Sequence, residues 1–381
     1  MPIYRYIFPL IICIGLLAAA CVEPYAPPAT ESTKSYLVVD GYVNSSDGSA
    51  TVKLTRSVSL ATTTAPPAEL NAIVTIEDDQ GKSTALTGDT KGNYTGTGII
   101  IGSNRLYRVR IVTSDKQEYL SDFVTLKDSP PIDDLAWVPL NDGVDVVVST
   151  HDDTDNSRYY QWSFDETWEY TAVYLSGFIF ENDTLLPRPF DQYIYRCWRT
   201  TSSQNIIIAS TDQLQKDVVD KKTLTHIPAG SQKLFIKYSM LAHQRVLTRD
   251  AYDYWEQLEK TTESLGGLFD PQPGKVSGNI HNTSNPDEPV LGYFSGGSVT
   301  SKRIFIKLGD LPNELRRYQG QEGCMIDTVL LEDVKNFIPI YSEALGTATN
   351  GPITIGYIFT SKTCADCRTQ GGVTTKPDFW Q

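Results

Sequence analysis

Residues that commonly build catalytic and metal-binding sites are scarce in this sequence. It contains 4 histidines and 3 methionines among 381 residues. The motifs Gly-x-Ser-x-Gly and His-Glu-x-x-His, which mark serine and zinc hydrolases, do not occur, and no glycine-rich phosphate loop precedes a predicted helix. We therefore expect a protein that is not an enzyme and that uses no cofactor and no metal.

Positive charge is also in short supply. The chain has 33 Lys and Arg residues against 46 Asp and Glu residues, which gives a net charge of -13. A protein this acidic repels the phosphate backbone, so nucleic acid is excluded as a partner. The acidic residues are spread along the chain, and this spread favours an ordinary solvated surface over a specific binding function.

Long apolar runs are absent after the first twenty residues, and the run at the start is short. Arg5 is followed by apolar residues from Ile7 to Ala20, a stretch shorter than the roughly 20 residues that span a bilayer as a helix. A basic start, a short apolar stretch and small residues before Cys21 are typical of a bacterial lipoprotein signal. We expect residues 1–20 to be a signal peptide and Cys21 to carry the lipid that anchors the protein.

The cysteines after the anchor are few but even in number. They are Cys197, Cys324, Cys364 and Cys367. In an exported chain this number predicts two disulfides, and the sequence does not choose among the three ways of pairing four cysteines. The spacing of Cys364 and Cys367 also fits a redox pair or half of a zinc site. Glycines and a proline follow where a redox motif has a helix, and no second close Cys or His pair is present, so structural disulfides are favoured.

The first part of the mature chain has the pattern of a β-sandwich. Residues 21–34 are rich in proline and small polar residues, which predicts an extended tether. From 35 to 128, short segments with period-two patterning alternate with turn residues. In one of them Tyr107, Val109 and Ile111 share a face opposite two arginines. Strands at this spacing predict an immunoglobulin-like β-sandwich over 35–128.

A larger, mainly β domain is expected from 129 to 381. Its clearest strand runs from Tyr160 to Tyr170, where aromatic residues occupy nearly every even position. A helix is predicted near 248–265 because Thr248 can cap it and apolar residues follow at helical spacing. We expect a fibronectin-like β domain with this helix as an insertion.

Glu166 interrupts the aromatic face of that long strand. A buried carboxylate is costly unless it is paired, so Glu166 should contact Lys, Arg or several hydrogen-bond donors. It can serve as a ligand-binding group or a general acid. It can instead be a structural polar anchor, or lie on a β-bulge that turns it outward, and we favour these structural interpretations. Trp162, Trp168 and Trp198 are the tryptophans that we consider for aromatic ligand binding, with core packing as the alternative.

A second group of aromatic residues surrounds Pro187 and Pro189. Its members can project from a loop to bind a ligand, or they can pack in a β core. They are Tyr174, Phe178, Phe180, Phe190, Tyr193 and Tyr195.

The segment from His151 to Ser157 is rich in oxygen-bearing side chains. Asp153, Asp155 and Ser157 have the spacing of calcium ligands. The EF-hand template then requires Gly and Glu at two later positions, which this sequence fills with Arg and Phe. We therefore expect a polar turn between strands and no metal site.

Short blocks of residues along most of the mature chain match one known group of proteins. Together they resemble the Bacteroidota lipoproteins catalogued as domain of unknown function 4249. The blocks are Tyr159-Tyr160, Trp162, Glu166-Thr167-Trp168-Glu169, Cys197-Trp198, Lys237-Tyr238-Ser239, Ala251-Tyr252, Tyr254-Trp255, Leu268-Phe269-Asp270-Pro271-Gln272-Pro273, Gly278-Asn279-Ile280, Gly292-Tyr293-Phe294-Ser295, Lys302-Arg303, Cys364, Asp366-Cys367-Arg368, Gly371-Gly372 and Phe379-Trp380.

The resemblance implies a location and a role, and it supplies no catalytic residues. Members of this group look like outer-membrane or surface lipoproteins that are often encoded beside TonB-dependent transporters. We therefore expect a non-enzymatic accessory of such a transporter, acting in nutrient binding or uptake. The alternatives are an envelope adhesion or structural module without a small-molecule ligand, and a glycan hydrolase with two carboxyl groups roughly 5 to 9.5 Å apart. The ligand, the oligomeric state and the side of the outer membrane are left open.

Overall fold

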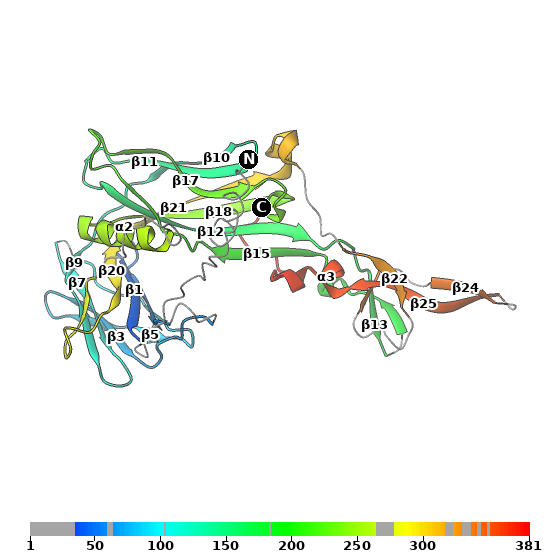
Figure 1. Ribbon diagram of the computed structural model, residues 1–381, viewed down its shortest axis with the longest axis horizontal. Coiled ribbons are helices and arrows are strands. Elements are labelled where there is room, and N and C mark those ends of the chain that lie inside the picture. The colour runs from blue at the N-terminus through cyan, green and yellow to red at the C-terminus, as the bar shows by residue number, and fades with distance from the viewer. Residues whose placement is uncertain are drawn as a thin grey trace, which may run out of the picture.

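The computed structural model of the protein describes residues 35–58, 64–102, 104–182, 184–263, 278–316, 323–329, 337–340, 344–348 and 351–381. The predicted signal peptide and the predicted tether, which begins with Cys21, lie outside these residues. The chain is mainly β, as predicted, and forms a sandwich, a larger β domain and a projecting arm (Figure 1). In the part of the chain that is described, no helix has the length and apolar character needed to cross a membrane.

The sandwich consists of two sheets that share one apolar core. The strands of the first sheet, in spatial order, are β20 (Leu291–Gly297), β1 (Leu37–Asn44), β2 (Ser49–Arg56), β6 (Asn93–Gly96) and β5 (Thr87–Gly88). Those of the second sheet are β19 (Ile280–Asn282), β8 (Glu118–Ser121), β7 (Leu106–Val112), β3 (Ile73–Asp78) and β4 (Ser83–Ala85), with β9 (Val124–Thr125) paired to β7.

Alternation of apolar and charged residues explains how β7 is oriented in the second sheet. Tyr107, Val109 and Ile111 are buried, as their period-two spacing predicts. The arginines between them face outward, where Arg108 contacts Glu77 on β3 at 2.8 Å and the arginine at position 110 contacts a glutamate on β8 at 2.6 Å. Cross-strand ion pairs of this kind fix the register of the sheet while its other face supplies the core.

The sandwich also contains strands from far beyond residue 128. β20 pairs in parallel with β1, with Gly41 opposite Phe294, and β19 pairs with β8. Phe294 is fully buried, and a Cβ atom at Gly41 would lie 2.8 Å from its ring, so glycine is required there. The side chain of Asn279 exchanges two hydrogen bonds of 2.8 Å with the backbone of Phe294, much as a strand residue would. Residues 278–297 therefore complete the domain that begins at residue 35.

The larger domain is built on two further sheets that enclose the second core. One sheet contains β10 (Ile132–Pro139), β11 (Gly143–His151) and β17 (Val218–Pro228). The other contains β15 (Arg196–Ser202), β12 (Tyr159–Thr171), β18 (Lys237–Val246) and β21 (Val299–Lys307), with β16 (Ile207–Ser210) paired to β12.

The long aromatic strand predicted from Tyr160 to Tyr170 is β12. Its even-numbered aromatic side chains are buried in the core of the larger domain, and Tyr160 and Tyr170 are fully buried. β12 pairs along almost its entire length with β18 on one side and with β15 and β16 on the other. The strand is therefore the centre of its sheet, which explains why so many large rings lie along it.

The predicted helix is present as α2 (Arg249–Glu263) and connects the two domains. The Thr248 hydroxyl accepts a hydrogen bond from the amide of Ala251, which confirms the predicted cap. The buried face of the helix packs in a small cluster with Ile208 and Leu247 of the larger domain and Tyr293 of β20. The ring of Tyr254 lies 5.2 Å from the ring of Tyr293. Two neighbouring residues of β20 thus have different partners: Phe294 packs in the sandwich core, and Tyr293 packs against α2.

The arm extends away from both domains (Figure 1). We define it as the described residues of 173–195 and 323–366. Its elements are β13 (Phe178–Glu181), β14 (Thr184–Pro187), η1 (Phe190–Gln192), β22 (Ile326–Val329), β23 (Phe337–Pro339), β24 (Ala344–Ala348), β25 (Gly351–Ser361) and α3 (Lys362–Ala365). At its base Ile194, Ile338, Ile340 and Ala365 form a separate small core.

Short 3-10 segments join the remaining elements. They are η2 (Gln232–Leu234), η3 (Leu308–Asp310), η4 (Asn313–Leu315) and η6 (Cys367–Gln370).

Candidate functional site

Glu166 is buried, and three donors satisfy its two oxygens. Glu166 lies on β12, whose inward-facing side chains are mostly aromatic, and the residue is 7% exposed. The Lys233 Nζ atom lies 2.6 Å from Oε1, the Thr201 hydroxyl donates to Oε1 at 3.1 Å, and the Tyr238 hydroxyl donates to Oε2 at 3.0 Å. Burial, together with the adjacent Glu166 carboxylate, raises the pKa of Tyr238 well above its ordinary value, so the phenol stays a donor. These contacts match the paired, structural anchor that the sequence favours.

The three tryptophans considered for ligand binding lie in or beside the core. Trp162 is 1% exposed, Trp168 5% and Trp198 8%. The indole of Trp162 donates to Gln244 at 2.9 Å, and that of Trp168 donates to Gln232 at 3.2 Å. The rings therefore contribute to packing and do not offer an open aromatic surface to a ligand in this structure.

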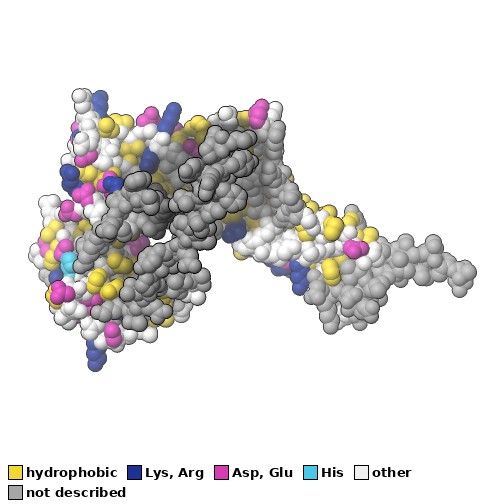
Figure 2. All heavy atoms as spheres, viewed as in Figure 1, with side chains coloured by type: hydrophobic (Ala, Val, Ile, Leu, Met, Phe, Trp, Pro, Cys, Tyr) yellow, Lys and Arg dark blue, Asp and Glu magenta, His cyan; other side chains and the backbone are white. Residues whose placement is uncertain are grey.

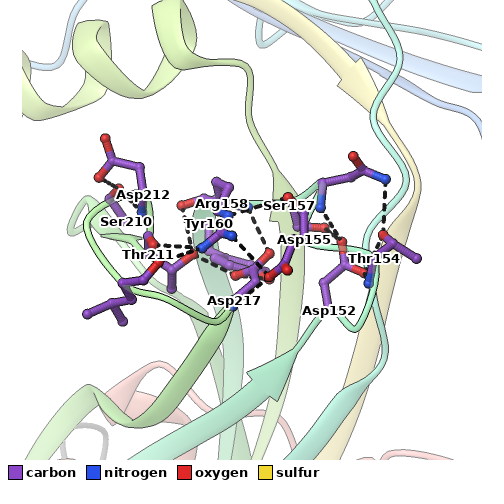
Figure 3. Close-up of polar contacts among 12 residues, drawn as sticks. Asp152, Thr154, Asp155, Ser157, Arg158, Tyr160, Ser210, Thr211, Asp212 and Asp217 are labelled. Atoms are coloured by element: carbon purple, nitrogen blue, oxygen red, sulfur yellow. Dashed lines mark hydrogen bonds and ion pairs between the residues drawn. The ribbon is translucent and has the colours of Figure 1, made fainter.

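The polar segment that begins at His151 forms a loop that is hydrogen-bonded both within itself and to the residues that precede β17 (Figure 3). One carboxylate oxygen of Asp152 accepts from both the amide and the hydroxyl of Thr154, and the other accepts from the Ser157 hydroxyl at 2.7 Å. Burial alone would raise the pKa of Asp152, but these hydrogen bonds lower it to about 2. Asp217, which is 1% exposed, accepts from Tyr160 at 3.0 Å.

The loop uses its oxygens to hold strands together. The amide of Asp217 donates to Asp155, and the Arg158 guanidinium contacts the same carboxylate at 3.0 Å. Within the residues that the structure describes, no group of three or more His, Cys, Asp or Glu side chains is arranged to hold a metal ion. The segment therefore fixes the turn between β11 and β12 to the start of β17.

Both predicted disulfides are present, and each joins one cysteine of the Cys-x-x-Cys pair to a distant partner. Cys197 is bonded to Cys367, and Cys324 is bonded to Cys364. The two members of the close pair are therefore not bonded to each other. The first disulfide links the larger domain to the segment after the arm, and the second lies at the base of the arm itself. The close pair therefore does not form the Cys-x-x-Cys redox disulfide that its spacing allowed.

Exposed apolar side chains are frequent on the arm. Phe190 is 89% exposed and Met325 78% exposed, whereas residues of their size are normally largely buried. Hydrophobic side chains gather on the arm in the space-filling view (Figure 2). Those with high exposure are Val173, Leu175, Leu186, Phe190, Tyr193, Met325, Ile326 and Phe337.

Part of the second aromatic group thus lies where a partner can reach it. The rings of Phe190 and Tyr193, which follow the β13–β14 hairpin, contact each other at a centroid distance of 5.4 Å. Tyr174 packs instead against the small core of the arm. The sequence alone did not separate these two behaviours, because the pattern of prolines and aromatics is the same for both.

A polar cleft of about 650 Å³ lies at one end of the sandwich. Its wall includes the start of β1, the turn between β7 and β8, and the loop that leads to β20. Tyr119 donates to Glu288 at 3.0 Å, and Arg56 is held by Glu69 at 2.6 Å. The lining residues are Ser35, Tyr36, Arg56, Asp115, Gln117, Tyr119, Asn285, Asp287, Glu288 and Pro289. The cleft is lined by both donors and acceptors of hydrogen bonds, and no motif in the sequence predicted it.

Comparison with known proteins identifies a family. The sequence model of a family described as Domain of unknown function (DUF4249) matches residues 22–303. This range covers the sandwich, most of the larger domain and β20, and it includes the first half of the arm. No curated protein matches the sequence.

Proposed function

The chain belongs to the DUF4249 family, and from that premise and its own surface we propose that it is a lipid-anchored, non-enzymatic accessory of a TonB-dependent transporter. The observation that carries the proposal is the projecting arm with its exposed apolar side chains, of which Phe190 and Met325 are the most exposed. Exposed apolar side chains that gather on one part of a folded protein are typical of a site that another protein covers.

Location at the cell envelope is supported by the oxidised cysteines. Disulfides persist in the periplasm and on the cell surface, whereas the cytosol keeps thiols reduced. Both disulfides connect positions distant in sequence, 170 and 40 residues apart. Together with the signal pattern before Cys21, they favour an exported and anchored protein.

The two buried carboxylates with the most complete hydrogen bonding support a binding function over a catalytic one. Glu166 and Asp217 are each surrounded by donors from the protein itself, so neither is free to transfer a proton to a substrate. Apolar and aromatic contacts at a protein interface need no such reactive groups.

Recovery of partners from native membranes tests the proposal. The tagged protein, solubilised in mild detergent, should recover a TonB-dependent transporter. A double variant with Phe190→Ser and Met325→Ser should recover about tenfold less, since central apolar contacts dominate interface energy. Leu214→Ser is the matched control, because Leu214 is 52% exposed but lies on the larger domain. Clean recovery of the wild-type protein without a transporter would count against the proposal.

A structural or adhesive envelope module is the second candidate. The same exposed arm favours it, because an apolar projecting surface suits a protein partner more than a small ligand. In that case the recovery experiment returns another envelope protein, and loss of the arm contacts changes cell-surface integrity without changing nutrient uptake.

A further inference from the structure

The two disulfides differ in how far solvent can approach them. Cys197 and Cys367 are both fully buried. Cys364 is 4% exposed, but its partner Cys324 is partly exposed and stands between two exposed residues, Gly323 and Met325. Thiol–disulfide exchange requires that a thiolate reach one of the sulfur atoms, so access separates a labile disulfide from an inert one.

Among the described residues, the segment 323–329 is joined to the arm by its disulfide, by strand pairing with β25 and by side-chain hydrogen bonds. No described side chain from 323 to 328 is buried. The segment pairs with one side of β25, with Ile326 opposite Thr360, and two side-chain hydrogen bonds reinforce it. The Tyr174 hydroxyl donates to the carbonyl of Cys324 at 3.1 Å, and the Thr360 hydroxyl donates to the carbonyl of Met325 at 2.7 Å. A strand with so few buried apolar contacts opens at low free energy.

The other disulfide is embedded in the larger domain. Cys197 and Cys367 both belong to its apolar core. The Tyr170 hydroxyl donates to the carbonyl of Cys367 at 2.7 Å, and the backbone of Trp198 pairs with Val373. A reductant can reach this bond only if the edge strand β15 and the apolar core behind it give way first.

We propose that Cys324–Cys364 is a redox latch for the arm, which a dithiol reductant opens selectively while the buried Cys197–Cys367 bond stays oxidised. The latched segment carries Met325 and Ile326, which are 78% and 44% exposed. When the Cys324–Cys364 bond opens, the segment that carries these two side chains is no longer tied to α3. The consequence for a partner rests on the proposed function, whereas selective opening does not.

The exchange is balanced with a dithiol as the only co-reactant. A thiolate of the dithiol attacks Sγ of Cys324, a mixed disulfide forms, and the Cys364 thiolate leaves and takes up a proton. The second thiol of the dithiol then attacks the mixed disulfide, releases Cys324 as a thiol and leaves the dithiol oxidised. Two electrons pass from the dithiol to the cystine, which becomes two thiols.

Graded reduction of the full-length folded protein tests the selectivity. The protein is incubated with increasing dithiothreitol, free thiols are alkylated, and each cysteine is assigned by peptide mass spectrometry. Cys324 and Cys364 should become alkylated at a dithiol concentration about tenfold lower than Cys197 and Cys367. Simultaneous alkylation of all four, earlier opening of Cys197–Cys367, or a new Cys364–Cys367 bond would each overturn the proposal.

Amide exchange shows whether opening releases the segment. In the selectively reduced and alkylated protein, residues 326–329 should exchange faster, whereas β12 should keep its protection. Unchanged protection of 326–329 would show that the disulfide restrains nothing and would overturn the latch. The double variant Cys324→Ser with Cys364→Ser provides the same state without alkylation, and the reduced wild-type protein covers the case in which that variant fails to fold.

Partner recovery separates the latch from the proposed function. If the oxidised protein recovers a transporter, the opened protein should recover several-fold less. Equal recovery from both states would overturn regulation by the latch. Failure of both states to recover a transporter would overturn the proposed function and leave the latch to be judged by alkylation and amide exchange alone.

Discussion

At the scale of single residues, Glu166 illustrates how a polar group is accommodated in an aromatic core. Its carboxylate accepts hydrogen bonds from Lys233, Thr201 and Tyr238, so its charge is compensated although the residue is almost fully buried. The need for a partner was predictable from the sequence, because a charge in an aromatic strand demands one. The identity of the partners was not, since Lys233 is separated from Glu166 by several strands and loops along the chain.

Replacing Glu166 tests this balance. Glu166→Gln keeps the size of the side chain but replaces one carboxylate oxygen with an NH2 group. That donor then faces another donor, Lys233 or Tyr238. We expect a loss of about 1 to 3 kcal/mol in the free energy of unfolding, the cost of a mismatched buried polar group. Urea denaturation monitored by tryptophan fluorescence measures it. Glu181→Gln, at an exposed position of the arm, should change the stability by less than about 0.5 kcal/mol; equal effects would contradict the assignment.

Asp152 gives a prediction about acid stability. Its pKa in the folded protein is lowered to about 2 from an ordinary 3.8. A carboxyl group whose pKa is lowered by folding stabilises the folded protein at pH values above its pKa in the unfolded chain. This stabilisation is lost as the pH falls from 3.8 toward 2. Asp152→Asn should therefore cost about 1 kcal/mol at pH 7, after allowance for solvent screening, and much less at about pH 2. Melting temperatures of both proteins at the two pH values test this, and a constant gap would refute it.

At the scale of elements, local patterns predicted individual strands and the helix but not their partners. β12 and α2 lie almost where period-two and helical spacing place them. The pairing of β20 with β1 joins residues about 250 positions apart, and no local pattern encodes it. The disulfide connectivity has the same origin, because three-dimensional proximity chose one of three pairings that the sequence left open. The exposed position of Phe190 likewise depended on the unpredicted arm.

The contact between β20 and β1 should be intolerant of side chains at one glycine. Gly292 has a φ of +120°, and a Cβ atom there would lie 1.7 Å from the carbonyl oxygen of Val39. Gly292→Ala should thus lower the free energy of unfolding by more than about 3 kcal/mol, through strain and loss of pairing. Gly309→Ala is the control, since nothing lies within 4 Å of the place that its Cβ atom would take. Equal melting temperatures of the two variants would show that β20 is dispensable.

At the scale of the whole molecule, α2 couples the sandwich to the larger domain. Tyr254 is 7% exposed and packs against Tyr293, while Ala251 beside it is fully buried. Because β20 holds Tyr293 in the sandwich, a change on α2 reaches both domains.

Tyr254→Ala should uncouple the domains. The loss of a buried ring costs about 3 to 5 kcal/mol, and we expect a single calorimetric transition to separate into two. Tyr254→Phe keeps the ring and should preserve one transition. Two transitions in the wild-type protein would show that the domains unfold independently and that the helix does not couple them.

β20 lies far along the sequence from β1, and this position has a consequence for biogenesis. An immunoglobulin-like domain usually folds once its own segment of chain has been made, but here a ribosome must translate as far as Gly297 before the first sheet can close. Until then β1 presents an unpaired edge and the gap left by Phe294 stays open, which are conditions that promote aggregation. In a chain exported in the way that we propose, the first domain therefore matures only after most of the second has been synthesised.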